Sequence, residues 1–281
     1  MEIKEVLKDN NFEFKKKFGQ NFITDTNLLE AICDDAELCG QDEVLEIGVG
    51  AGTLTKVLAS KCKKVVGYEI DKSLFDVLSV SLKGCDNIEI VFKDFLKTTA
   101  EEVNSQFSGK FKVVANLPYY ITTNIIFALV EGGFNVDSLT LMVQKEVADR
   151  LSSKPSTKDY GTITAELDCV GNVETKRIVG RQMFTPMPNV DSAIVNIKLN
   201  KNKYDIKDVE LVRKVIRAAF SMRRKTLANC LKTNFSFSSE QIDNIFASLG
   251  FDKNIRGETL TTQNFVDLAN FIYDMRSKQK M

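Results

Sequence analysis

Short apolar runs alternate with helix-type patterns between residues 44 and 143 of this 281-residue chain. Strands are expected at Val44–Ile47, Val65–Ile70, Ile88–Phe92, Phe111–Ala115 and Ser138–Val143. Helices are expected between them, at Thr53–Ala59, Lys72–Leu82 and Ile121–Glu131. Such alternation builds a parallel sheet with helices on both faces and a ligand crevice at the carboxyl ends of its strands. We therefore predict an α/β fold with a Rossmann-like, doubly wound sheet.

The pattern changes after residue 160. Gly161–Thr164, Val173–Val179 and Ala193–Lys198 alternate polar and apolar residues in the manner of partly exposed or edge strands. A lysine-rich join at residues 200–207 precedes helices expected near 208–221, 225–231, 239–249 and 261–274. We place the domain boundary near residue 203. The first domain then covers residues 1–202, with a basic N-terminal segment at 1–25, and a smaller all-helical domain covers 203–281.

Composition excludes several kinds of chemistry. The chain has no histidine, which rules out Ser–His and Cys–His nucleophilic catalysis. Its six cysteines form no CxxC pair, so no metal site is expected. No apolar run approaches the ~20 residues of a membrane helix, and the N-terminus has no signal-peptide layout. We expect a soluble, cytoplasmic monomer with no membrane partner.

Basic residues gather in two places although the net charge is zero. Residues 201–281 hold 15 Lys and Arg against 9 Asp and Glu. This surplus indicates a polyanion contact, although a solvated helical surface explains it equally well. The residues expected to contact RNA phosphates are Lys15, Lys16, Lys17, Arg223, Arg224 and Lys225.

A glycine-rich turn, Gly48-Val49-Gly50-Ala51-Gly52, follows the first predicted strand. Its spacing is neither that of a dinucleotide-binding turn nor that of a phosphate loop. Gly48 and Gly50 allow close backbone approach by a ligand, unless the turn is only a tight strand-to-helix connection. Glu69 lies about 20 residues further on, where an acidic residue binds ribose hydroxyls. Asp94 follows the next strand and suits an adenine amine, while both carboxylates have alternative roles as helix caps or surface charges.

The sequence Asn116-Leu117-Pro118-Tyr119 directly follows another predicted strand. The Asn116 side-chain oxygen and the Leu117 carbonyl are placed to accept the two hydrogens of an adenine N6 amine. Pro118 fixes the turn and has no N–H to compete, and Tyr119 is expected to stack on the base. An activated methyl donor leaves only orientation and electrostatics to the protein, so no general base is needed. Together with the glycine turn, this sequence predicts methyl transfer from S-adenosylmethionine to an amino nitrogen.

A second loop, Phe184–Ser192, carries an aromatic residue and two prolines. We expect Phe184 to face Tyr119 and to complete a clamp on a base that has left its stack. The alternative is a proline-stiffened connection before an edge strand.

The motifs as a set resemble the small-subunit ribosomal RNA adenine dimethyltransferases. They are Phe18–Phe22, Glu46–Gly50, Asn116–Thr123, Met142–Ala148, Val190–Ala193 and Phe220–Leu227. The resemblance spans about residues 14 to 260. It implies that two methyl groups are transferred to N6 of each of two adjacent adenosines in a hairpin near the 3′ end of small-subunit (16S) rRNA. It also implies a cytoplasmic enzyme that acts on a late pre-30S particle.

The resemblance also assigns residues. Cofactor contacts are implied for Asn21, Ile23, Gly48, Glu69, Asp94 and Asn116. Adenine contacts are implied for Asn116, Leu117, Pro118, Tyr119 and Phe184. Antibiotic-resistance methyltransferases of large-subunit rRNA share the glycine turn and a similar Asn-x-Pro-Tyr loop, and they remain one alternative. An rRNA-binding assembly factor with incidental methylation is a second alternative, and a DNA adenine methyltransferase is a third.

Overall fold

The structure, a computed structural model, describes residue 15, residues 21–222 and residues 224–278. It divides into two compact units. The sheet unit comprises Met1–Ala148 and Glu174–Leu199, and the helical unit comprises Asp149–Val173 and Asn200–Met281. From the sequence, residues 149–173 were expected in the first domain, whereas in the structure this segment belongs to the helical unit.

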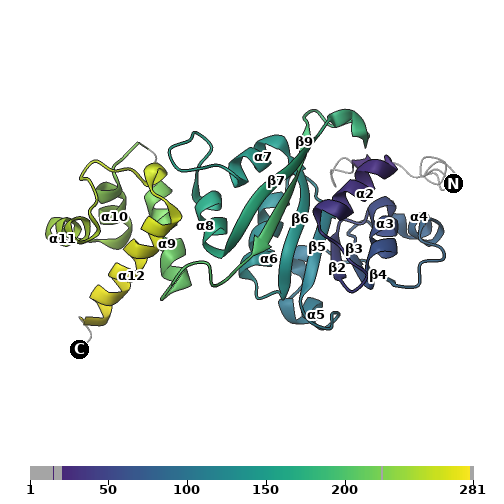
Figure 1. The fold of residues 1–281 in the computed structure, drawn as a ribbon, viewed down its shortest axis with the longest axis horizontal. Helices are drawn as coiled ribbons and strands as arrows, with labels where there is room; N and C mark the ends of the chain where they lie inside the picture. Colours follow the sequence, from purple (N-terminus) through teal and green to yellow (C-terminus); the bar gives the residue numbers. More distant parts are fainter. Residues whose placement is uncertain (1–14, 16–20, 223, 279–281) are drawn as a thin grey trace. The chain divides into compact units, whose positions relative to one another are not determined.

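A seven-stranded sheet, with strand order β4-β3-β2-β5-β6-β9-β7, organises the sheet unit (Figure 1). The strands are β2 (Glu43–Ile47), β3 (Lys64–Tyr68), β4 (Ile88–Val91), β5 (Phe111–Asn116), β6 (Val136–Gln144), β7 (Gly171–Val179) and β9 (Ser192–Leu199). Strands β2 to β6 pair in parallel, and β9 runs antiparallel to β6. The predicted alternation and fold class are confirmed, with one antiparallel strand added.

Helices connect the parallel strands: α3 (Thr53–Lys61), η2 (Lys72–Leu74), α4 (Phe75–Ser81), η3 (Phe95–Lys97), α5 (Ala100–Asn104) and α6 (Thr122–Glu131). Two further helices flank this series, α2 (Thr26–Asp35) before β2 and α7 (Lys145–Leu151) after β6. The chain steps outward from β2 to β3 and β4, and then returns to β5 on the other side of β2. This reversal places a topological switch point between β2 and β5, where open α/β sheets bind their ligands. The glycine turn and Asn116 follow or end these two strands.

Two strand predictions were wrong. Gly161–Thr164 was expected as a strand but opens α8 (Thr162–Val170). Apolar and polar residues alternate along this helix, which resembles a strand with one exposed face. In the structure, however, the polar residues Thr164 and Glu166 are buried as well. The Thr164 hydroxyl donates to the Arg150 carbonyl, and Glu166 pairs with Arg217. Period-two patterning is therefore misleading where a helix is buried on most of its sides.

Ala193–Lys198 was predicted as a partly exposed or edge strand, but it lies in β9, inside the sheet between β6 and β7. Its first residues are buried on both faces. The edge position belongs to β7, as predicted for Val173–Val179. A two-stranded ribbon of β1 (Phe22–Ile23) and β8 (Phe184–Thr185), with η4 (Arg181–Met183) before it, was not predicted.

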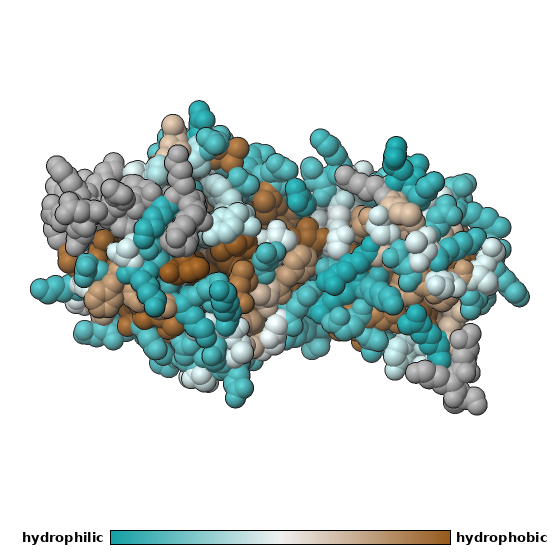
Figure 2. Space-filling view, turned by 180° about the vertical axis from the view of Figure 1, so that it is seen from behind, coloured by the Kyte–Doolittle hydropathy of each residue, from teal (hydrophilic) through white to brown (hydrophobic). Residues whose placement is uncertain are grey.

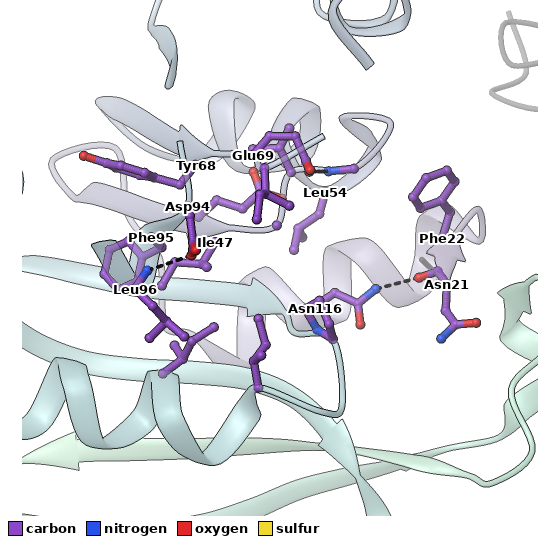
Figure 3. A pocket seen from close by; sticks show the side chains of 18 of the residues that line it. Asn21, Phe22, Ile47, Leu54, Tyr68, Glu69, Asp94, Phe95, Leu96 and Asn116 are labelled. Carbon is purple, nitrogen blue, oxygen red and sulfur yellow. Dashed lines mark hydrogen bonds between the residues drawn. The ribbon is translucent and has the colours of Figure 1, made fainter. Parts of the chain in front are cut away.

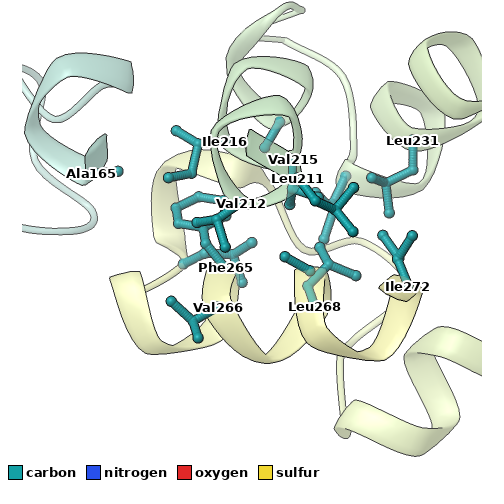
Figure 4. Packing of buried hydrophobic residues seen from close by; sticks show 14 of the residues in the cluster. Ala165, Leu211, Val212, Val215, Ile216, Leu231, Phe265, Val266, Leu268 and Ile272 are labelled. Atoms are coloured by element: carbon teal, nitrogen blue, oxygen red, sulfur yellow. The ribbon is translucent and has the colours of Figure 1, made fainter. Parts of the chain in front are cut away.

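The helical unit is built around an apolar core formed largely by α9 and α12 (Figure 4). Its helices after α8 are α9 (Val209–Phe220), α10 (Leu227–Phe235), α11 (Ser239–Leu249), η5 (Gly257–Thr259) and α12 (Thr262–Lys278). Ser238 caps α11: its Oγ accepts from the Gln241 N–H, and its own N–H donates to Gln241 Oε1. Gly250 ends the helix in a left-handed conformation. Ordinary amphipathic patterning and caps thus account for this unit.

The two units differ in surface character. On the face drawn in Figure 2, hydrophobic side chains reach the surface of the sheet unit, at the left of the view, whereas mostly hydrophilic side chains cover the helical unit. Ile70, Leu96 and Tyr120 are among the exposed apolar residues of the sheet unit. In the described part of the chain, no helix has the length and apolar character needed to cross a membrane.

Candidate active site

A cavity of about 220 Å³ opens where β2, β3, β4 and β5 end (Figure 3). Every residue predicted from the sequence to contact the cofactor lines this cavity: Asn21, Ile23, Gly48, Gly50, Glu69, Asp94 and Asn116. Pro118 and Tyr120 line it as well. The tertiary structure therefore gathers the ends of four strands and a segment of the N-terminal region around one cavity.

The glycine turn lies close to its neighbours and needs its glycines. Gly48, Gly50 and Gly52 have φ values of +80°, +60° and +80°. A Cβ on Gly50 would lie 2.9 Å from Cε1 of Phe22, so a larger residue would clash as well as strain the backbone. The Gly50 N–H donates to Glu69 Oε2 at 2.8 Å. This turn is thus held against both the N-terminal segment and the acidic residue after β3.

Glu69 is fixed by backbone donors on both carboxylate oxygens. In addition to the bond from Gly50, Glu69 Oε1 accepts from the Asp71 N–H at 2.7 Å. Burial raises the pKa of Glu69, whereas these N–H groups lower it. Each carboxylate oxygen can accept more than one hydrogen bond. Glu69 therefore keeps acceptor capacity toward the cavity it lines, as binding of ribose hydroxyls requires.

Asp94 combines the two roles that its position suggested. Its Oδ1 accepts from the Leu96 N–H at 3.1 Å and so caps η3. The same side chain lines the cavity beside Phe95 and Leu96. A capped carboxylate between apolar side chains suits an adenine ring that carries an amine donor.

Glu46 was not predicted as a site residue. It lies in β2, is 1% exposed and lines the cavity. Its Oε2 has no hydrogen-bond partner among the described residues. Burial, together with the nearby Glu69 carboxylate, raises the pKa of Glu46 to about 8, although the Thr55 hydroxyl lowers it. The sequence signal for Glu46 is that it is the one charged residue of the predicted strand Val44–Ile47.

These features fit the proposed cofactor class. A buried carboxylate oxygen without a hydrogen-bond partner among the described residues, on a residue that lines the cavity, suits a cationic amine, and S-adenosylmethionine carries one on its amino-acid part. Glu69 and Asp94 suit its ribose and adenine, and the glycines allow close approach to the turn. No cluster of three His, Cys, Asp or Glu in the described residues is arranged to hold a metal ion.

Asn116 is oriented by the N-terminal segment. Its Nδ2 donates to the Asn21 carbonyl oxygen at 2.9 Å (Figure 3). A carbonyl can only accept, so the amide nitrogen must face Asn21. The side-chain oxygen of Asn116 is thereby left on the opposite side as an acceptor. The structure thus gives the asparagine the orientation that holding an amine requires.

The other predicted acceptor-site residues differ in exposure. Leu117 is buried, Pro118 lines the cavity, and the Tyr119 hydroxyl lies 2.8 Å from Ser192 Oγ. Burial raises the pKa of Tyr119, and the Ser192 bond lowers it. Tyr120, which was not predicted as a site residue, is 62% exposed and lines the cavity, whereas Leu117 and Tyr119 do not line it.

Phe184 lies in β8, where it pairs with Ile23 of β1, and it is buried in an apolar cluster. It does not line the cavity in this conformation. Its role in a clamp opposite Tyr119 stays a prediction. The β1–β8 pairing does connect the Phe184 loop to the segment that orients Asn116.

The predicted RNA contacts are only partly described. Lys16, Lys17 and Arg223 lie outside the described residues. Lys15 donates to Asp71 Oδ1 and Ser73 Oγ, both at 2.7 Å, which brings it beside the Glu69 loop. Arg224 and Lys225 are exposed in the helical unit. Their contact with RNA stays a prediction.

Comparison with known proteins identifies the family. The model of the ribosomal RNA adenine dimethylase family matches residues 11–274. Ribosomal RNA small subunit methyltransferase A of Clostridium acetobutylicum is 42% identical over 96% of this chain and 98% of its own. The Bacillus cereus (strain B4264) protein of the same name is 43% identical over 95% of this chain and 94% of its own.

Solved structures agree on the fold. A dimethyladenosine transferase from Plasmodium falciparum superposes with a TM-score of 0.75 at 24% identity, over 90% of this chain and 98% of that one. The 23S rRNA methyltransferase ErmE superposes with a TM-score of 0.70 at 26% identity, over 89% of this chain and 98% of the ErmE chain. The family match over nearly the whole chain, together with a cavity that fits the methyl donor, confirms the sequence-based resemblance. The chain belongs to the ribosomal RNA adenine dimethylase family of S-adenosylmethionine-dependent methyltransferases.

Proposed function

We propose that this protein dimethylates N6 of two adjacent adenosines in a hairpin near the 3′ end of small-subunit rRNA. The observation that carries the proposal is the orientation of Asn116, whose side-chain oxygen is left as an acceptor in the cavity that contains the glycine turn. Relatives at 42–43% identity bear the name small subunit methyltransferase A, which favours this substrate over large-subunit rRNA.

The cofactor side of the cavity is assigned to four groups. The backbone of Gly48 and Gly50 approaches the amino-acid part, and Glu46 accepts from its ammonium. Glu69 accepts from the ribose hydroxyls, and Asp94 from the adenine amine. S-adenosylmethionine supplies a methyl group that is already activated by its sulfonium, so these residues bind and orient.

On the acceptor side, the Asn116 side-chain oxygen and the Leu117 carbonyl accept the two hydrogens of the target N6 amine. This arrangement directs the nitrogen lone pair away from the two acceptors. Tyr119 stacks on the extruded base, which orders it further. Positioning and preorganised acceptors then supply the rate enhancement without a general base, in keeping with a chain that lacks histidine.

Methyl transfer to undermethylated small ribosomal subunits tests the proposal. Label from methyl-tritiated S-adenosylmethionine should enter the rRNA with the wild-type protein. Asn116→Ala should lower the rate about 100-fold or more, since it removes a preorganised contact to the reacting group. Asn116→Asp should lower it as well, because an ionised carboxylate repels the Asn21 carbonyl. Exposed Asn244 in α11 provides the control Asn244→Ala, which should keep full activity.

Full activity of Asn116→Ala would contradict the proposed hydrogen bond between the Asn116 side chain and the target amine. Transfer to large subunits or to duplex DNA in preference to small subunits would contradict the substrate. Primer extension across the hairpin, in a strain lacking the protein, locates the modified positions.

We further propose that a pre-30S particle is the partner of this protein, that the enzyme acts in the cytoplasm as a monomer, and that the helical unit contacts rRNA. The basic surplus after residue 200 and the exposed Arg224 and Lys225 support the RNA contact. An assembly role separate from methylation predicts that Asn116→Ala still binds pre-30S particles and restores assembly in a deletion strain. Loss of both would make methylation the dominant role.

A further inference from the structure

Two adjacent tyrosines in the Asn116 loop are held differently. The Tyr119 ring is partly buried and its hydroxyl lies 2.8 Å from Ser192 Oγ. Tyr120 is 62% exposed. Tyr120 lines the cavity and Tyr119 does not, so the stacking role of Tyr119 rests on the proposed function. The tyrosine that the proposed function assigns to base stacking is thus held by a hydrogen bond, and its neighbour is exposed.

Ser192 is placed at the ligand edge of the sheet. It is the first residue of β9 and pairs with Gln144, the last residue of β6. Asn116, the last residue of β5, pairs with Met142 of the same strand β6. Ser192 and Asn116 are therefore both connected to the carboxyl end of β6, one from each side.

Ser192 is also held in place by its surroundings. It is fully buried, and in the described part of the chain its hydroxyl has a hydrogen bond to Tyr119 alone. The preceding residue, Asp191, is held twice: its carbonyl accepts from the Lys145 N–H and its Oδ1 from the Arg181 N–H. A hydroxyl on a strand anchored in this way moves little.

We propose that Ser192 is a positioning residue that fixes the Tyr119 ring for stacking on the target adenine. This inference rests on the proposed function. The tyrosine hydroxyl lies on the long axis of the ring, so holding it fixes χ1 and with it the place of the ring. A ring ordered in advance loses less conformational freedom when the base stacks, and the base reaches its reactive position in a larger fraction of complexes.

Removal of this bond should act on turnover rather than on binding. Ser192→Ala should lower kcat for rRNA methylation about five- to tenfold, the size expected for one lost hydrogen bond. The KM values for S-adenosylmethionine and for the small subunit should stay within twofold, because the cofactor cavity and the phosphate contacts are untouched. A role in folding alone would lower the melting temperature and leave kcat per folded enzyme unchanged.

Tyr119→Phe deletes the other half of the bond and keeps the stacking ring. It should reproduce the loss of kcat, and the double variant should be no slower than either single variant, because one interaction is removed in all three. Tyr160→Phe is the matched control, since its hydroxyl donates to the Leu260 carbonyl at 2.9 Å within the helical unit. This variant should keep kcat.

Each outcome is decisive. Equal losses in both single variants without a further loss in the double support the role of Ser192. Wild-type kcat in Tyr119→Phe, or additive losses in the double variant, would overturn it, and Tyr119→Phe decides alone if Ser192→Ala does not fold. If the wild-type protein transfers no methyl group to small subunits, the proposed function fails, and that result is distinct from a failure of this inference.

Discussion

The ligand edge of the sheet and the core of the helical unit bury very different residues. At the ligand edge, Glu46 and Glu69 are carboxylates with 1% and 5% exposure, and the turn beside them has three left-handed glycines. In the helical core, Val215, Phe265 and Leu268 are apolar and fully buried. Burial of a carboxylate costs stability, whereas burial of an apolar side chain stabilises the fold.

The difference separates residues that stabilise the fold from residues that bind ligand. The helical core contributes folding stability, whereas the buried carboxylates at the sheet edge lower folding stability and provide hydrogen-bond acceptors that are already in place. Substitutions in the core should therefore lower stability and spare turnover, whereas substitutions at the edge should affect binding or turnover and sometimes raise stability.

Phe265→Ala in α12 should show the largest change in stability. Phe265 is fully buried, and truncation of a buried phenylalanine costs about 3–5 kcal/mol of unfolding free energy. Urea denaturation measures it, and kcat per folded enzyme should be unchanged below the transition. Phe75→Ala is the control, because Phe75 is 60% exposed and should cost about 1 kcal/mol or less. A small loss of unfolding free energy in Phe265→Ala would contradict the view that the helical core contributes most to stability.

Glu46→Gln should stabilise the protein as pH rises. The folded pKa of about 8 lies above the ordinary value of 4.5 for a glutamate, so the contribution of this group to folding stability is full below pH 4.5 and is lost as pH rises toward 8. The slope is about 1.4 kcal/mol per pH unit, or roughly 2–3 kcal/mol between pH 5.5 and 7.5. Denaturation at both pH values should show the variant gaining on the wild type by this amount.

The same substitution should weaken cofactor binding above pH 8, where Glu46 is ionised, because an amide attracts an ammonium less than a carboxylate does. Calorimetric titration with S-adenosylhomocysteine, which keeps the ammonium, measures this loss. An equal stability difference at both pH values would show that Glu46 is already ionised in the folded protein.

Gly50→Ala should raise the KM for S-adenosylmethionine about tenfold. Its φ of +60° costs alanine about 1–2 kcal/mol, and the Cβ would press on Phe22, which also lines the cavity. Gly84→Ala is the control: its φ is +87°, and nothing lies within 4 Å of its Cβ. This control should lose similar stability and keep the KM. Equal KM values for the two variants would remove the special role of the turn.

Lys225→Ala should have the smallest effect. If the helical unit contacts rRNA phosphates, the slope of log affinity for small subunits against log salt should decrease by about 1. Lys253→Ala, on another exposed lysine of the same unit, should leave the slope unchanged. Equal slopes for both variants would restrict the RNA contact to other surfaces.

The sequence by itself determined the fold class and most of the cofactor-binding side of the site. Gly48, Glu69, Asp94 and Asn116 are readable because each lies just past an apolar strand, and parallel strands end at one edge. The capping of α11 by Ser238 and Gly250 is local as well. These features depend on neighbours in the sequence, which is why a pattern can reveal them.

Only the tertiary structure decided the features that depend on distant residues. Glu46 is part of a strand in the sequence pattern, and only the fold shows that it lines the cavity and that its Oε2 has no partner among the described residues. The Asn116 amide is oriented by Asn21, 95 positions away, and the Tyr119 hydroxyl by Ser192, 73 positions away. The burial of Thr164 and Glu166 that made α8 resemble a strand likewise comes from other elements. Burial and the direction of a hydrogen bond are set by what packs against a residue, and the order of the chain alone does not contain that information.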